Sequence, residues 1–124
     1  MPSFGKQSKK HRDTCHADLR RVLDEAIKHY DFSCIWGHRG KEDQDKFFEL
    51  GTSTVKWPNS KHNANPSNAF DVIPYPDGFN APDEEFYKLA THILAAASKL
   101  GVRLRWGGHW RSFRDMAHFE LRND

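Results

Sequence analysis

The sequence predicts an α+β fold, in which helices cover one face of a small, mainly antiparallel sheet. Two observations support this class. The sequence contains both amphipathic helical patterns and short strand-like runs, and these segments do not alternate regularly as they would in βαβ units. The 124 residues suffice for one domain with a modest core. We expect that domain over residues 13–124, with the polar face of the sheet carrying the site.

The first twelve residues are polar and basic, and we expect this segment, residues 1–12, to be a flexible terminus. Nineteen basic against seventeen acidic residues give a net charge of +2, which is too weak to indicate a nucleic-acid partner. Two cysteines, Cys15 and Cys34, are too few for a disulfide framework, and Cys34 is expected in the core.

No apolar stretch approaches the length of a membrane span, and the N-terminus lacks the apolar core of a secretory signal. We therefore expect no membrane insertion and synthesis in the cytoplasm, so a target outside it would be reached by another route. We expect a monomer.

Apolar residues at helical spacing predict a helix over 15–29 and a second one that ends near Leu100, with Gly101 after it. A shorter helix is expected over 41–50, with three apolar side chains turned inward: Phe47, Phe48 and Leu50. Four runs have the composition of strands: 32–36, 69–73, 102–106 and 117–121. Residues 51–68 form a long connection, which in a small domain is usually functional or disordered.

Residues 60–71 place an imidazole and a carboxylate on either side of a turn. Asp71 falls inside an apolar strand and needs a partner, because burial of an unpaired charge is costly. A metal ion shared with His62 is one such partner, and His118 offers a third ligand. Zinc sites with three protein ligands and an open position are typical of catalysis. Taken singly, these residues would be a turn histidine, a strand-edge charge and a buried imidazole.

The motifs together resemble those of zinc peptidases that cut peptidoglycan stem peptides, which include D-alanyl-D-alanine carboxypeptidases and phage L-alanyl-D-glutamate endopeptidases. The similarity rests on Ser60-x-His62, Ala69-x-Asp71 and Asp115-x-x-His118. The phage endolysin branch is the most similar, through Gly37-His38-Arg39 with Gln44 and Trp106-Gly107-Gly108-x-Trp110. The resemblance covers roughly residues 15–122, nearly the whole chain.

The resemblance implies a fold shared with D,D-peptidases and the hedgehog signalling domain, and it implies three zinc ligands: His62, Asp71 and His118. It also implies that Asp115 is the general base, that Arg39 binds the carbonyl oxygen of the scissile bond and that Ser60 lines the substrate cleft. Glu120 shares the strand face of His118, so it is a second candidate base or an acceptor for a ligand imidazole.

Some of these residues also have a purely structural interpretation. Arg39 could simply pair with Asp43 or Asp45, and two tryptophans are expected in the core: Trp106 and Trp110. The chain also departs from the family pattern in two places. The step from His62 to Asp71 is nine residues where seven is common, and His109 stands where an Asp is usual.

The leading functional hypothesis is a zinc L-alanyl-D-glutamate endopeptidase that acts as a phage endolysin in host cell lysis. It would be made in the host cytoplasm, released through a separate membrane pore, and would act on peptidoglycan stem peptides. A D,D- or L,D-carboxypeptidase on the same scaffold is the near alternative. A non-catalytic zinc- or wall-binding module is the distant one, although such a module needs neither Asp115 nor Arg39.

Overall fold

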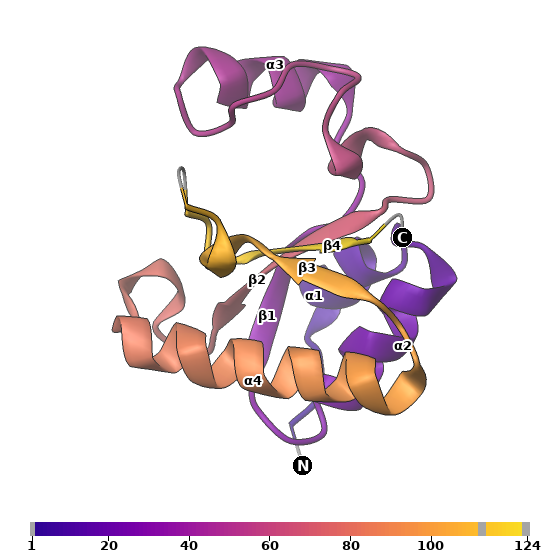
Figure 1. The fold of residues 1–124 in the computed structure, drawn as a ribbon, viewed down its shortest axis with the longest axis vertical. Coiled ribbons are helices and arrows are strands. Elements are labelled where there is room, and N and C mark those ends of the chain that lie inside the picture. Colours follow the sequence, from indigo (N-terminus) through magenta and orange to yellow (C-terminus); the bar gives the residue numbers. More distant parts are fainter. Residues whose placement is uncertain (1, 112–113, 123–124) are drawn as a thin grey trace.

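The computed structural model describes residues 2–111 and 114–122, and these form an α+β fold (Figure 1). Its single sheet has the strand order β1-β2-β4-β3, and every neighbouring pair is antiparallel. The strands are β1 (Phe32–Trp36), β2 (Ala69–Pro74), β3 (Leu104–Trp106) and β4 (His118–Leu121). The predicted antiparallel sheet is therefore confirmed, although β3 is shorter than the expected run over 102–106.

Helices α2 (Ala17–Ala26) and α4 (Asp83–Leu100) pack together on one face of the sheet (Figure 1). Their apolar side chains join those of the strands in the main core, where the ring of Phe70 on β2 stacks on that of Phe119 on β4. Side chains alternate along a strand, so the neighbours of these two phenylalanines point to the opposite face. Asp71 and His118 therefore share the face that α2 and α4 leave open.

Much of the basic N-terminal segment, whose composition predicted a flexible terminus, is helical and packs on the sheet. Residues Lys6–Arg12 form helix α1, which lies along the edge strand β1. Phe4 is buried with its ring edge-on to Phe32, and the hydroxyl of Ser8 accepts a hydrogen bond from the backbone N–H of Cys34. Helix α1 thus covers a strand edge that would otherwise expose unpaired backbone groups.

Helix α3 (Lys41–Glu49) lies on the open side of the sheet, away from α4 (Figure 1). The expectation of three inward apolar residues is wrong here, because Phe48 is 37% exposed and Leu50 is 64% exposed. The buried residue of α3 is Gln44, and Phe47 is half-buried. Helix α3 therefore packs on polar groups beside the candidate site rather than on the core.

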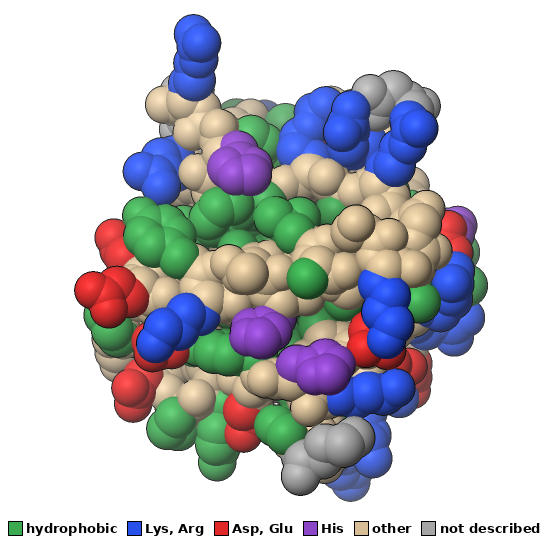
Figure 2. Space-filling view, turned by 60° about the horizontal axis from the view of Figure 1, so that its bottom comes forward, with side chains coloured by type: hydrophobic (Ala, Val, Ile, Leu, Met, Phe, Trp, Pro, Cys, Tyr) green, Lys and Arg blue, Asp and Glu red, His purple; other side chains and the backbone are tan. Residues whose placement is uncertain are grey.

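The α4 side of the molecule carries charges of both signs. Figure 2 shows Lys, Arg, Asp, Glu and His side chains interspersed on the α4 side of the molecule, as the small net charge implies. Among the described residues, no helix combines the length and the apolar character that crossing a bilayer would require. Cys15 and Cys34 are both buried and unbridged, which confirms the expectation for Cys34.

Candidate metal centre and cleft

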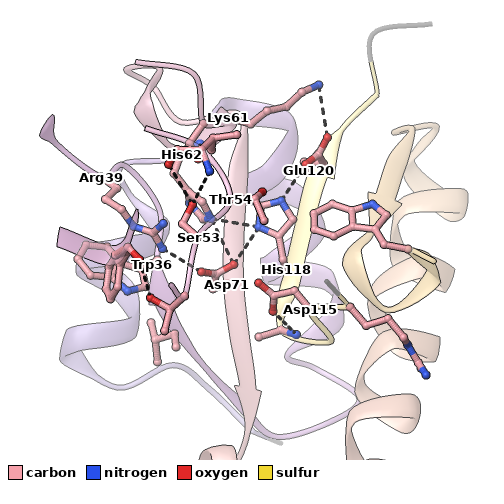
Figure 3. A pocket seen from close by; sticks show the side chains of 18 of the residues that line it. Trp36, Arg39, Ser53, Thr54, Lys61, His62, Asp71, Asp115, His118 and Glu120 are labelled. Carbon is pink, nitrogen blue, oxygen red and sulfur yellow. Dashed lines mark hydrogen bonds and ion pairs between the residues drawn. The ribbon is translucent and has the colours of Figure 1, made fainter. Parts of the chain in front are cut away.

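Three side chains from separate segments meet on the open face of the sheet (Figure 3). His62 comes from a short 3-10 helix (Lys61–Asn63), Asp71 from β2 and His118 from β4. His62 Nε2 lies 3.2 Å from both Asp71 Oδ1 and His118 Nδ1, and His118 Nδ1 lies 3.1 Å from Asp71 Oδ1. All three residues are buried, and together they form a group that could hold a metal ion.

Hydrogen bonds on the far side of each ring turn a nitrogen of both histidines toward Asp71. His62 Nδ1 lies 2.8 Å from the carbonyl oxygen of Gly37, and His118 Nε2 lies 2.8 Å from Glu120 Oε1. Because these acceptors carry no proton, the rings donate to them, and His62 Nε2 and His118 Nδ1 are left as potential ligands. Such outer hydrogen bonds are the usual way in which metal-ligating imidazoles are oriented.

The donor set and its dimensions fit a tetrahedral divalent cation. Metal bonds of about 2.0–2.2 Å place neighbouring ligand atoms about 3.3–3.5 Å apart, close to the separations found here.

The buried carboxylate of Asp71 also requires positive charge beside it. Burial alone would raise the pKa of Asp71, but His62 and His118 hold it well below its usual range. Burial alone would lower the pKa of His118, but Asp71 and Glu120 raise it to about 9. A bound cation would meet this requirement in place of protons.

Arg39 lies directly behind the carboxylate of the candidate ligand Asp71. Its Nη2 donates to Asp71 Oδ2 at 3.1 Å, so its partner is Asp71 rather than Asp43 or Asp45. The guanidinium is also enclosed by the rings of Trp36 and Phe47, at 4.8 and 4.6 Å from their centroids. This contact leaves Oδ1 of Asp71 directed at the two imidazoles.

Gln44 joins this guanidinium to the loop that follows α3. Its side chain is fully buried, and its Oε1 accepts from Arg39 Nη1 and from Asn63 Nδ2, both at 3.2 Å. Its Nε2 donates to Ser53 Oγ at 3.0 Å and to the Val55 carbonyl at 2.8 Å. The Gln44 amide therefore connects the loop after α3 to Arg39, which contacts Asp71, and to Asn63, which follows His62 in the chain.

Ser60 caps the short helix that carries His62. The Ser60 hydroxyl accepts from the backbone N–H of His62 at 3.2 Å, and Asn63 Oδ1 accepts from the N–H of Ser60 at 3.0 Å. Ser60 also lines the cleft described below. The long step from His62 to Asp71 is accommodated because Ser67 pairs with the backbone beside Cys15, so the turn lies against the domain.

Asp115 sits in a tight turn before β4. Its Oδ1 accepts from the N–H of Ala117 at 3.2 Å, and its carbonyl accepts from the N–H of His118 at 3.2 Å. A Cβ at position 107 would collide with the Asp115 carbonyl, so Gly107 permits this close approach. Burial first, and then the charge of Asp71, raise the pKa of Asp115. A raised pKa suits a carboxylate that must accept a proton near neutral pH.

Glu120 is already engaged by a candidate ligand. Its Oε1 is the partner of His118 Nε2, and its Oε2 lies 3.6 Å from Lys61 Nζ. Burial would raise the pKa of Glu120, but the hydrogen bond from His118 and the charge of Lys61 lower it. Of the two roles open to Glu120 in the sequence, this geometry favours the acceptor for a ligand imidazole.

A cleft of about 880 Å³ runs over the triad, and its lining contains every candidate site residue. Strands β1, β2 and β4 form the floor, the loop after α3 forms one wall, and the other wall includes Trp110, Arg114 and Asp115. Figure 3 shows His62, Asp71, His118 and Asp115 directed into the same space. The expectation that Trp110 is core is wrong, because it lines the cleft with its ring 5.3 Å from that of His118.

The second tryptophan and the unusual histidine of this region have clear positions. Trp106 is buried in the core, as predicted. His109, the departure from the family pattern, is exposed, and its ring packs against Trp106 with centroids 4.8 Å apart. The loop wall around Ser53 and Val55 was not identified from sequence. The available signal was the length of the 51–68 connection, which does not specify individual residues.

Two known proteins are similar to this chain over nearly its whole length. The chain is 32% identical over 124 residues to the L-alanyl-D-glutamate peptidase of Escherichia phage T5, covering 96% of this chain and 88% of that one. The crystal structure of the Serratia marcescens L-Ala D-Glu endopeptidase ChiX superposes with a TM-score of 0.83 at 26% identity, covering 98% of this chain and 91% of the other.

Fold and site together define a small α+β protein with a buried His-Asp-His group that opens into a cleft. The model of one family, the phage L-alanyl-D-glutamate peptidases, matches residues 2–122. The chain belongs to this family of phage L-alanyl-D-glutamate peptidases, and the resemblance drawn from the sequence motifs is confirmed.

Proposed function

We propose that this chain is a zinc-dependent endopeptidase that cuts the L-alanyl-D-glutamate bond of peptidoglycan stem peptides and acts as an endolysin. The observation that carries the proposal is the buried group of His62, Asp71 and His118 at the floor of a cleft that also holds Asp115. The family and both relatives bear the name of this activity, which supports an endopeptidase over a carboxypeptidase or a binding module.

The donor set supports zinc as the metal. Two imidazole nitrogens and one carboxylate oxygen suit this borderline-soft ion, and three protein ligands leave one position for water or substrate. Bound there, zinc would lower the pKa of a water molecule and polarise the scissile carbonyl. Glu120 and the Gly37 carbonyl would keep both rings in the orientation that binding needs.

Asp115 would act as the general base. Peptide hydrolysis requires a group that removes a proton from the attacking water and later delivers a proton to the leaving amine. Asp115 lines the cleft beside His118, and burial and the charge of Asp71 raise its pKa, which favours the uptake of a proton by its carboxylate. Glu120 is less suited to this exchange because it is held between His118 and Lys61.

Arg39 would hold Asp71 in its ligating orientation and place positive charge beside the carbonyl oxygen as negative charge develops on it. Its ion pair with Asp71 supports the first part of this role, and its place in the cleft lining supports the second. Ser60 would contribute in two ways, by capping the helix that presents His62 and by lining the cleft for the substrate.

As an endolysin, the protein would be made in the host cytoplasm and reach the wall through a membrane pore formed by another protein. It would act as a monomer on the peptide, with no nucleic acid involved. The whole candidate site lies within one chain, which supports action without a second subunit.

Digestion of purified peptidoglycan tests the activity. Mass spectrometry of the products should show a new amino terminus on D-glutamate, which depends on zinc and is absent with Asp115→Asn. Release of D-alanine instead would identify a carboxypeptidase. A zinc-loaded protein that binds the wall but yields no product would identify a binding module.

A further inference from the structure

Among the described residues, the cleft lining contains three lysine or arginine side chains, and two of them are paired with carboxylates. Arg39 is bonded to Asp71, and Lys61 Nζ lies 3.6 Å from Glu120 Oε2. The third is Arg114, which is exposed. Its charge is therefore the one that is best placed to meet an anion entering from solvent.

Arg114 is anchored in a way that leaves its terminal nitrogens available. Its Nε donates to the carbonyl oxygen of Gly108 at 3.2 Å, which fixes the middle of the side chain on the loop after β3. Within the described part of the chain, this is its one hydrogen bond, so Nη1 and Nη2 are not engaged there. A guanidinium presents these donors as a planar fork that matches the two oxygens of a carboxylate.

The proposed substrate carries such a carboxylate next to the scissile bond. Glutamate has two carboxyl groups, and only one of them can continue the chain, so the other stays free and negatively charged. This glutamate supplies the leaving amine, to which Asp115 would deliver a proton. Arg114 immediately precedes Asp115 in the sequence, and both residues line the same cleft. The free carboxylate of the residue that supplies the leaving amine would therefore enter the cleft that Arg114 lines.

We propose that Arg114 determines substrate specificity by binding the free carboxylate of the D-glutamate that follows the scissile bond. The inference rests on the proposed endopeptidase function and adds a binding partner for one particular group of the substrate. It predicts a preference for glutamate with a free carboxylate over the same residue with that carboxylate amidated.

Two synthetic peptides separate this subsite from general charge effects. Both are N-acetyl-L-Ala-D-Glu-L-Lys amides linked through the glutamate γ-carboxyl, and they differ only in an α-carboxylate or an α-carboxamide on D-glutamate. The amidated C-terminus removes every other carboxylate. For the zinc-loaded wild type, kcat/KM for the carboxylate peptide should exceed that for the carboxamide by about tenfold, the scale of one charge-assisted hydrogen-bonded pair.

Arg114→Gln should reduce this ratio to about one, mainly through KM for the carboxylate peptide. Arg111→Gln is the matched control, because Arg111 is an exposed arginine of the same loop that does not line the cleft. It should keep the wild-type ratio. An unchanged ratio in Arg114→Gln, or an equal loss in Arg111→Gln, would overturn the subsite. A wild type that cuts both peptides equally would overturn it and keep the endopeptidase, whereas one that cuts neither would overturn both.

Discussion

Arg39 and Asp71 form a buried ion pair in which Nη2 lies 3.1 Å from Oδ2, the carboxylate oxygen that does not face the two imidazoles. The two oxygens of Asp71 thus have different neighbours: Oδ2 pairs with the Arg39 guanidinium, and Oδ1 faces the candidate metal position. The orientation of Asp71 therefore depends on Arg39. A substitution at residue 39 should alter metal binding at the candidate site as well as substrate turnover.

Arg39→Ala should weaken zinc binding by roughly tenfold to a hundredfold, the range for loss of a group that orients a metal ligand. Competition with a chromogenic chelator measures this. Arg21→Ala, which removes an exposed arginine paired with Asp18, should leave zinc affinity unchanged.

Activity at saturating zinc then separates the two proposed roles of Arg39. A kcat that stays about a hundredfold low would support stabilisation of the carbonyl oxygen, since that is the scale of one lost oxyanion donor. Full recovery of kcat would confine Arg39 to holding Asp71.

Asp115→Asn should retain about one zinc per chain and its melting temperature, yet lose at least about a hundredfold in kcat, because an amide cannot accept the proton. His62→Ala should lose the metal itself. Zinc content by metal analysis and turnover of peptidoglycan are the two measurements.

Glu120→Gln is the comparison for Asp115→Asn, because it alters the other acidic candidate while keeping its size. It should lower zinc affinity more than kcat at saturating metal. The assignment of the base would have to move to Glu120 if Glu120→Gln were inactive while Asp115→Asn kept its turnover. Loss of zinc from Asp115→Asn would instead make Asp115 a ligand.

Gln44→Leu should destabilise the fold by about 2 kcal/mol or more, because it removes the acceptor of buried donors on Arg39 and Asn63. Urea unfolding followed by circular dichroism measures the loss. The control is Gln7→Leu, an exposed position of α1, which should change the free energy of unfolding by less than about 0.5 kcal/mol. Equal effects at both positions would show that the network around Gln44 contributes little.

Acid should remove a stabilising contribution from Glu25. Its hydrogen bonds from His29 and Lys99 lower the pKa of the carboxyl from 4.5 to about 2. A depressed folded-state pKa contributes stability that is complete above the unfolded value and is lost as pH falls from about 4.5 toward 2. Wild type should therefore lose more melting temperature than Glu25→Gln over this interval. Parallel curves for the two proteins would contradict the assignment.

The sheet and the candidate ligands could be predicted because each depends on local pattern. Strand composition predicted β1 and β2, and three short motifs indicated that His62, Asp71 and His118 lie together. Partners distant in the sequence were not predictable in the same way. Helix α1 looked like a solvated tail because the burial of Phe4 depends on Phe32, far along the chain.

Helix α3 shows the same limit for polar packing. Its apolar residues suggested the inward face, but the open side of the sheet offers Arg39 and Asn63 rather than a hydrophobic surface. Gln44 satisfies those groups, so Phe48 and Leu50 turn to solvent. The pattern of apolar residues cannot identify the buried face of a helix when that face is polar and packs through hydrogen bonds.

The three candidate ligands come from segments that are far apart along the chain, a 3-10 helix, a central strand and the last strand. The site therefore does not exist in an unfolded or truncated chain, and binding of the ion would be thermodynamically linked to folding. At a free zinc concentration one hundred times the dissociation constant, this linkage adds about 2.7 kcal/mol to stability. Metal supply would then set the lifetime of the enzyme as well as its turnover.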